Sequence, residues 1–140
     1  MSLLGLDFGE RRIGVALAET GGTTARPLTI IVRESRDHDL ARLKQIVEGF
    51  GVEVVVVGLP LNMDGTSGQA VRRARRFANQ VQHQLGLRVE LWDERLTTWE
   101  ADQQMLEAGL TPERRRELRD AVAAALILQD YLQSREGQVE

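Results

Sequence analysis

The chain has 140 residues, of which 42% are hydrophobic and 28% charged, and we expect residues 1–140 to form a single globular domain. It contains no cysteine and only two histidines, which excludes disulfides and thiolate metal sites and argues against a histidine-based zinc site. No stretch approaches about 18 apolar residues, and no basic segment precedes Asp7. We therefore expect no membrane span, no signal peptide and a cytoplasmic protein.

Positive charge is concentrated in arginine clusters, although the net charge is −3. The net charge argues against a protein that coats nucleic acid without specificity. Seventeen of the eighteen positive residues are arginines, whose planar guanidinium suits phosphate oxygens. Two clusters are candidates for substrate binding: Arg72, Arg73, Arg75 and Arg76 in one, and Arg114, Arg115 and Arg116 in the other. A solvated helix face is the alternative interpretation of either cluster.

The first half of the chain predicts three short strands and a helix. Residues 3–7, 13–18 and 27–32 are apolar runs separated by turn residues, and Pro27 stands at a strand start, where a missing N–H is tolerated. Asp37 or Asp39 can cap the helix that follows, and Gly49 or Gly51 can end it.

The second half predicts helices that alternate with buried strands. Residues 52–57 include four consecutive valines, which is typical of a strand buried on both faces. A helix with one apolar stripe runs to Leu85, a fifth strand covers residues 87–92, and a capping-box pattern opens a helix over residues 97–108. A last helical region begins at Pro112, is apolar over residues 121–132, and should fray over residues 134–140.

These elements predict an α/β fold with a mixed five-stranded sheet flanked by helices. The three opening strands are joined by short turns and should be antiparallel. The fourth and fifth strands each follow a helical crossover and should lie parallel to the first.

Acidic residues stand where the carboxyl ends of the parallel strands should meet. Asp7 ends the first strand, and Asp93 and Glu94 end the fifth. Because neighbouring strand residues point to opposite faces, only one of Asp93 and Glu94 can share a face with Asp7. Asp120 begins the apolar part of the last helix, on the stripe that should pack on the sheet.

Three carboxylates brought together would repel one another, and a divalent cation would remove that cost. Hard oxygen ligands favour Mg²⁺ or Mn²⁺. Two such ions could stabilise the attacking water and the leaving oxygen of a phosphodiester. Taken singly, Asp7 could instead start a turn and Asp120 could cap a helix.

Six segments, taken in order, resemble the YqgF/RuvX family from about residue 3 to residue 132. They are Leu6-Asp7-Phe8-Gly9, Arg12-Ile13-Gly14-Val15-Ala16, Thr24-Ala25-Arg26-Pro27-Leu28, residues 57–66, Asp93-Glu94-Arg95-Leu96-Thr97-Thr98 and Asp120-Ala121-Val122-Ala123-Ala124.

Members of that family are described as pre-16S ribosomal RNA nucleases or Holliday-junction resolvases. The resemblance implies a ribonuclease-H-like fold and catalytic, metal-binding carboxylates at Asp7, Glu94 and Asp120, and it selects Glu94 over Asp93. Arg95 and Thr98, beside Glu94, are further candidates for contact with a nucleic-acid substrate. Relatives carry a variable basic loop at residues 109–119, which here is more helical in composition.

Two other functions compete with a nuclease. Leu6-Asp7-Phe8-Gly9 also resembles the first phosphate loop of sugar kinases and actin-like ATPases, but those proteins need two such domains to enclose a nucleotide. A non-catalytic nucleic-acid-binding module would keep the fold, yet its acids would only repel the backbone. Within the nuclease hypothesis, precursor ribosomal RNA and branched DNA both stay open. Junction resolution would need a homodimer, for which the sequence shows no interface.

Overall fold

The computed structural model describes residues 1–22, 24–62, 64–66, 68–94 and 111–138, with the side chains of residues 114–117 and 135–138 excepted. The strands are β1 (Ser2–Phe8), β2 (Arg12–Glu19), β3 (Arg26–Val32), β4 (Val52–Leu59) and β5 (Arg88–Asp93). The helices are α1 (Arg36–Phe50), α2 (Gln69–Leu85) and α4 (Pro112–Gln138). The expected helix over residues 97–108 lies outside the described residues.

The strands form one mixed sheet in the order β3-β2-β1-β4-β5. β2 pairs antiparallel with both β1 and β3, whereas β4 is parallel to β1 and β5 is parallel to β4. The predicted topology is therefore confirmed. Pro27 is tolerated because β3 is an edge strand, so its missing N–H costs the sheet no central hydrogen bond.

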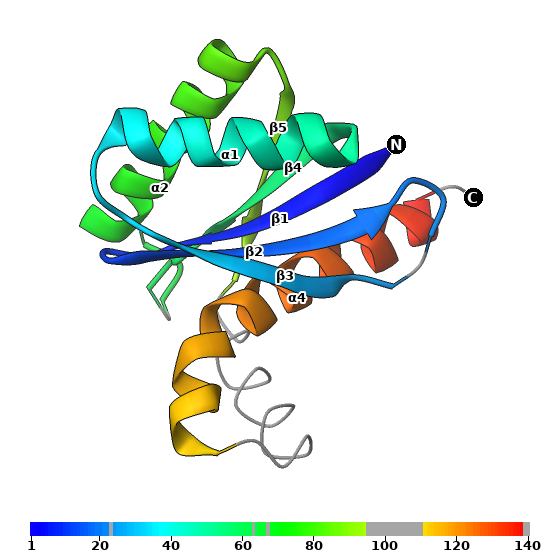
Figure 1. Cartoon of the computed structure of the whole chain (residues 1–140). Coiled ribbons are helices and arrows are strands. Elements are labelled where there is room, and N and C mark those ends of the chain that lie inside the picture. Colours follow the sequence, from blue (N-terminus) through cyan, green and yellow to red (C-terminus); the bar gives the residue numbers. More distant parts are fainter. Residues whose placement is uncertain (23, 63, 67, 95–110, 139–140) are drawn as a thin grey trace.

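Helices cover both faces of the sheet (Figure 1). α1 and α2 pack on one face through a core that includes Leu4, Leu6, Val55 and Val57. α4 packs on the other face, where Ala124, Ile127 and Leu128 meet Leu3, Ala16 and Val56. Successive valines of β4 thus belong to different cores, which explains the uninterrupted apolar run in the sequence.

Glycines on two strands let α4 approach the sheet at backbone distance. A Cβ at Gly5 would lie 2.7 Å from the carbonyl oxygen of Ala124, and a Cβ at Gly14 would overlap the carbonyl group of Asp120. Any larger residue at Gly14 would therefore push α4 outward just where the helix reaches the edge of the sheet.

The predicted start of the first helix needs correction. α1 begins at Arg36 and is capped by Ser35, whose hydroxyl accepts the His38 backbone N–H, so Asp37 and Asp39 lie inside the first turn. At its other end α1 stops at Gly51, which has a φ of 62°. α4 extends to Gln138, and the fraying expected over residues 134–140 stays a prediction.

The described helices are all either too short or too polar to cross a membrane.

Gly14→Ala should destabilise the fold by about 1–3 kcal/mol or more, because the new methyl group must displace backbone rather than a flexible side chain. Gly49→Ala, in α1, is the matched control: nothing lies within 4 Å of a Cβ there, and alanine favours helix. Denaturant unfolding of both variants measures the difference. Equal stabilities would show that α4 can move away from β2 without cost.

A candidate active site at the carboxyl edge of the sheet

Asp7 lies near the carboxyl end of β1, on the face that α4 covers. Gly5, two residues earlier on the same face, contacts α4, and Asp7 pairs with Gly14 on β2. Leu6 and Phe8 point to the opposite face and join the α1/α2 core. Strand alternation therefore directs the Asp7 carboxylate toward the start of the packed part of α4.

Glu94 follows β5 and is positioned by the end of β4. Its backbone N–H donates to the Leu59 carbonyl oxygen at 3.2 Å, one step beyond the last ladder pair, Leu59 with Asp93. Its side chain lies over Gly58, where a Cβ would overlap its carboxylate. The Glu94 Oε2 atom is buried and has no hydrogen-bond partner within the part of the chain that the structure describes.

Asp120 lies in α4 at the point where the helix meets the sheet. Its carbonyl group contacts Gly14 of β2, and the buried residues of α4 begin at Ala121. The side chain is half-buried and lies close enough to Arg12 and Arg119 to be stabilised by both positive charges. Three segments that are distant in sequence thus bring Asp7, Glu94 and Asp120 to one edge of the sheet.

The electrostatics of the three acids are those of like charges held away from water. Burial raises the pKa of Asp7 to about 6, the negative charge of Asp120 adds to that rise, and a hydrogen bond from Glu94 partly offsets it. Burial raises the pKa of Glu94 to about 8, with the charge of Asp7 and the same hydrogen bond adding to it. Burial also raises the pKa of Asp120, against the effect of Arg12 and Arg119. A protonated Glu94 that donates to the Asp7 carboxylate accounts for the first two shifts.

This donor set fits a hard divalent cation, because it consists of carboxylate oxygens, one of them the orphaned Oε2 of Glu94. As the side chains are arranged, no three histidine or acidic side chains among the described residues form a complete metal-binding group. The side-chain hydrogen bond between Asp7 and Glu94 shows that these two carboxyl groups lie close enough for both to contribute to one site.

The other predicted substrate contacts are only partly placed. Arg73 and Arg76 lie on α2, at the same end of the sheet as Phe8 but on the opposite face from the carboxylates. Arg72 and Arg75 are exposed on the same helix. Arg95 and Thr98 lie outside the described residues, as do the side chains of Arg114, Arg115 and Arg116.

Arg12 is a site residue to which sequence analysis gave no role. It begins β2, two residues before Gly14 and therefore on the α4 face, and its charge stabilises the ionised form of Asp120. The alternation of Arg12 and Gly14 against the buried Ile13 could have placed it beside the acids.

The fold is shared with solved resolvases that belong to the ribonuclease-H-like class. One is the RuvC protein of T. thermophilus in complex with a Holliday junction substrate, with a TM-score of 0.61 at 20% identity over 98% of this chain and 97% of that one. Another is the fowlpox virus resolvase with Holliday junction DNA, with a TM-score of 0.60 at 11% identity over 96% of this chain and 99% of that one. The sheet order and this likeness thus place the chain in the ribonuclease-H-like fold class.

Within that class the chain belongs to the RuvX family. The model of that family, described as "Holliday junction resolvase", matches residues 1–134. Two relatives named "Putative pre-16S rRNA nuclease" are similar over most of their length. The protein from Moorella thermoacetica is 49% identical over 94% of each chain, and that from Syntrophus aciditrophicus is 45% identical over 94% of this chain and 88% of its own. The predicted family membership is confirmed, and the family is one of nucleases.

Metal-free protein should lose stability as pH rises from about 4.5 to about 8, the range between the ordinary and folded pKa values of Glu94. Over that range the folded state binds more protons than the unfolded state, so rising pH favours unfolding. The stability of Glu94→Gln should depend less on pH. Near pH 8 its melting temperature should lie several degrees above that of the parent.

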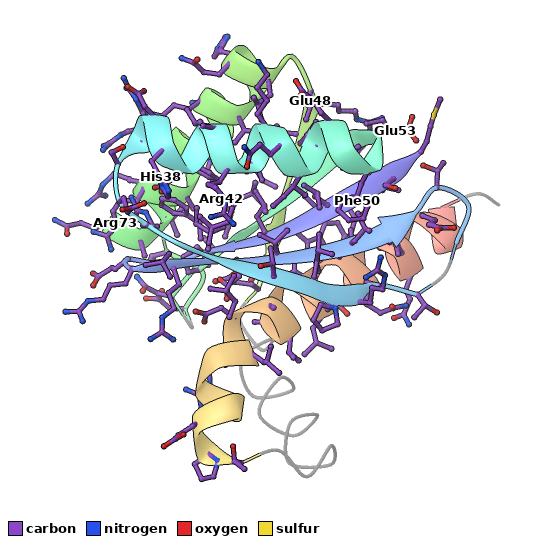
Figure 2. The ribbon with its side chains drawn as sticks, viewed as in Figure 1. His38, Arg42, Glu48, Phe50, Glu53 and Arg73 are labelled. Atoms are coloured by element: carbon purple, nitrogen blue, oxygen red, sulfur yellow. The ribbon has the colours of Figure 1, made fainter. Side chains whose placement is uncertain are left out.

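Thermal melts across that range, with chelator present, provide the measurement. Glu48→Gln is the control, because that side chain is 67% exposed on α1 and should leave the pH dependence unchanged (Figure 2). Parallel pH dependences for the parent and Glu94→Gln would contradict the electrostatic account of the site.

Proposed function

We propose that this protein is a divalent-metal-dependent nuclease that hydrolyses phosphodiester bonds of structured nucleic acid, with Asp7, Glu94 and Asp120 as its catalytic residues. The observation that carries the proposal is the convergence of these three carboxylates on one face at the carboxyl edge of the sheet. Acids arranged in this way cost stability, and a function in metal binding explains why they are gathered.

Asp7, Glu94 and Asp120 would hold Mg²⁺ or Mn²⁺, which would supply charge stabilisation and a water activated for attack on the phosphorus. The chain's own groups have separable tasks. Asp7 and Glu94 would both offer carboxylate oxygens to the cation, and the hydrogen bond between them keeps the two side chains close together. The charge of Arg12 favours the ionised form of Asp120 against the effect of burial, and its guanidinium would offer positive charge to a phosphate that approaches the same edge. α4 excludes water from the inner side of the site.

Precursor 16S ribosomal RNA is the substrate that we favour, with processing of its end during ribosome biogenesis as the role. The support is that relatives more than 40% identical over nearly the whole chain carry that name. A cytoplasmic location follows from this role. A four-way DNA junction is the second candidate, supported by the description of the matching family model, and it would require a homodimer.

Incubation of the purified protein with Mn²⁺ and three substrates separates these candidates: structured precursor ribosomal RNA, single-stranded RNA and a four-way DNA junction. Selective cleavage of the precursor supports the favoured substrate. Paired, symmetrical cuts in the junction would replace it with the second candidate. No cleavage of any substrate would contradict the proposal.

Asp7→Asn should lower the rate of cleavage by more than about a hundredfold, since even residues that only support a metal ligand cost up to that much. The same variant should melt at a higher temperature than the parent without metal, because carboxylate repulsion is relieved. Mn²⁺ should raise the melting temperature of the parent and not that of the variant. Residual activity within about tenfold of the parent would remove Asp7 from the site.

Glu94→Gln should abolish metal-dependent turnover, whereas Asp93→Asn should be much milder. Asp93 is the adjacent acid and makes the matched control, since it is exposed and pairs with Leu59 at the end of the ladder while Glu94 lies over Gly58. Single-turnover cleavage by both variants gives the comparison. Equal losses would show that both acids act at the site.

A further inference from the structure

A cavity of about 190 Å³ opens on the face of the sheet opposite to the carboxylates. It lies between the end of β1, the start of α1 and the first turns of α2. Its lining combines arginines with a pair of aromatic rings and one acid: Phe8, Arg33, Arg36, Asp39, Arg73, Arg76, Phe77 and Gln80. Figure 2 shows Arg73 and His38 at this end of the molecule, and Phe50 and Glu53 at the other.

The lining is strongly positive, although the chain as a whole has a net charge of −3. Four arginines stand against a single aspartate. Asp39 is buried, and its carboxylate is already engaged by Arg33, by His38 and by the Glu34 backbone N–H. Arg36 also pairs with an acid, Asp37, at 3.9 Å, but both side chains are exposed and the pair is weak. Four arginines and one aspartate leave the lining itself with three more positive than negative groups.

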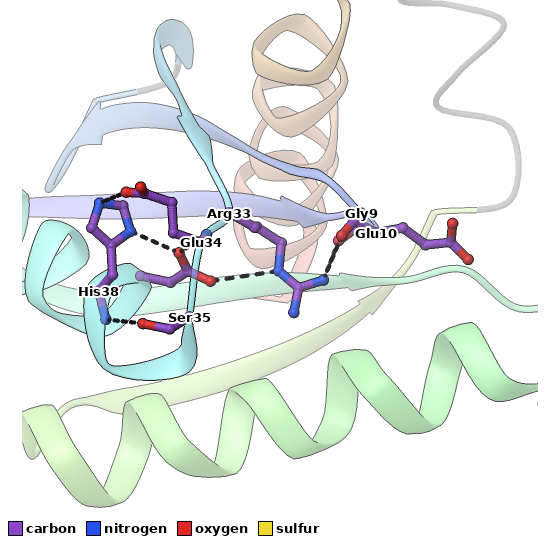
Figure 3. Close-up of polar contacts among 7 residues, drawn as sticks. Gly9, Glu10, Arg33, Glu34, Ser35 and His38 are labelled. Carbon is purple, nitrogen blue, oxygen red and sulfur yellow. Dashed lines mark hydrogen bonds and ion pairs between the residues drawn. The ribbon is translucent and has the colours of Figure 1, made fainter.

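Arg33 lines the cavity and is held by several polar contacts (Figure 3). Its Nη1 donates to the carbonyl oxygens of Gly9 and Glu10, at 2.9 Å each, and its Nε lies 3.5 Å from Asp39 Oδ2. The guanidinium also stacks 4.3 Å from the ring centre of Phe8, which in turn stacks on Phe77. A guanidinium fixed before binding loses little entropy when it meets an anion.

Arg73 and Arg76, on α2, also line the cavity and are less constrained. Arg73 reaches Glu10 of the β1–β2 turn at 3.3 Å, in a pair whose glutamate is 77% exposed and therefore weakly held. Arg76 is exposed and makes no ion pair with any described residue. Both side chains can turn toward a ligand without breaking a buried contact.

We propose that this cavity binds a backbone phosphate of the nucleic-acid strand, at a site distinct from the three carboxylates. Guanidinium groups match phosphate oxygens in geometry as well as in charge. The proposal deepens the proposed function, on which the identity of the strand rests. A nucleic acid is favoured over an acidic peptide because Phe8 and Asp7 are consecutive in β1, so the cavity and the acids lie at the same end of the sheet. A strand that crosses the β1–β2 turn can reach both.

The test compares Arg73→Gln/Arg76→Gln with Arg42→Gln/Lys44→Gln. The control removes the same charge from α1, at exposed positions that do not line the cavity. Binding of a short fluorescein-labelled single-stranded RNA is followed by anisotropy over a range of salt concentrations. EDTA is present, so neither cleavage nor metal contributes to the affinity.

The cavity variant should bind roughly tenfold or more weakly than the parent, the size expected when hydrogen bonds to a charged group are removed. The slope of log affinity against log salt should fall by roughly 0.7 for each phosphate that the variant no longer neutralises, and the control should change both quantities less. Equal changes in the two variants would overturn the proposal, because they would reduce the cavity's role to general charge.

A second experiment distinguishes a phosphate of an RNA strand from free phosphate and from the carboxylates of an acidic peptide. Inorganic phosphate and a poly-glutamate peptide are each offered to the parent and to the cavity variant by calorimetry. Binding of RNA that depends on the cavity, with weak binding of both small probes, supports a strand phosphate. Cavity-dependent binding of free phosphate or of the peptide, without any effect on RNA, would overturn it. Cleavage is assayed separately, so absence of nuclease activity in the parent would contradict only the proposed function.

Discussion

The close approach of α4 to the sheet is the contact on which the candidate site depends. Gly5 and Gly14 have no side chains, so the helix backbone lies against β1 and β2, and the contact begins at Asp120. A conventional helix–sheet distance, set by interposed side chains, would hold Asp120 away from Asp7. The burial of Ala124, Ile127 and Leu128 holds the helix in this position and so fixes the third acid relative to the first two.

The apolar contact and the acids oppose each other energetically. Packing of α4 removes water from the edge of the sheet, and the same loss of water raises the pKa values of Asp7, Glu94 and Asp120. Hydrophobic burial elsewhere in the two cores must offset the repulsion that results. The carboxylates of the site therefore lower the stability of the fold, because the packing around them removes water. Such a loss of stability at a functional site is common in proteins.

Much of this arrangement could be predicted from the sequence, because its signals are local. The valines of β4 and the short turns between the first strands determine the topology, and the resemblance to known relatives selected Glu94. Contacts between elements that are distant in sequence could not be predicted in the same way. That α2 carries Arg73 to the opposite face from Asp7 depends on how its apolar stripe docks, and Ser35 replaces Asp37 as the cap because its hydroxyl reaches the His38 N–H. The role of Arg33 required a partner, Asp39, whose burial no pattern reveals.

β1 serves two sites with two consecutive residues. Asp7 faces α4 and the other acids, whereas Phe8 faces α1 and α2 and lines the cavity with the arginines. Because strand side chains alternate strictly, inserting or deleting one residue in β1 would exchange the two faces and place an aromatic ring among the carboxylates and an acid among the arginines. Both the carboxylate site and the cavity therefore constrain the length of this strand. Insertions and deletions along the chain should be confined to the loops.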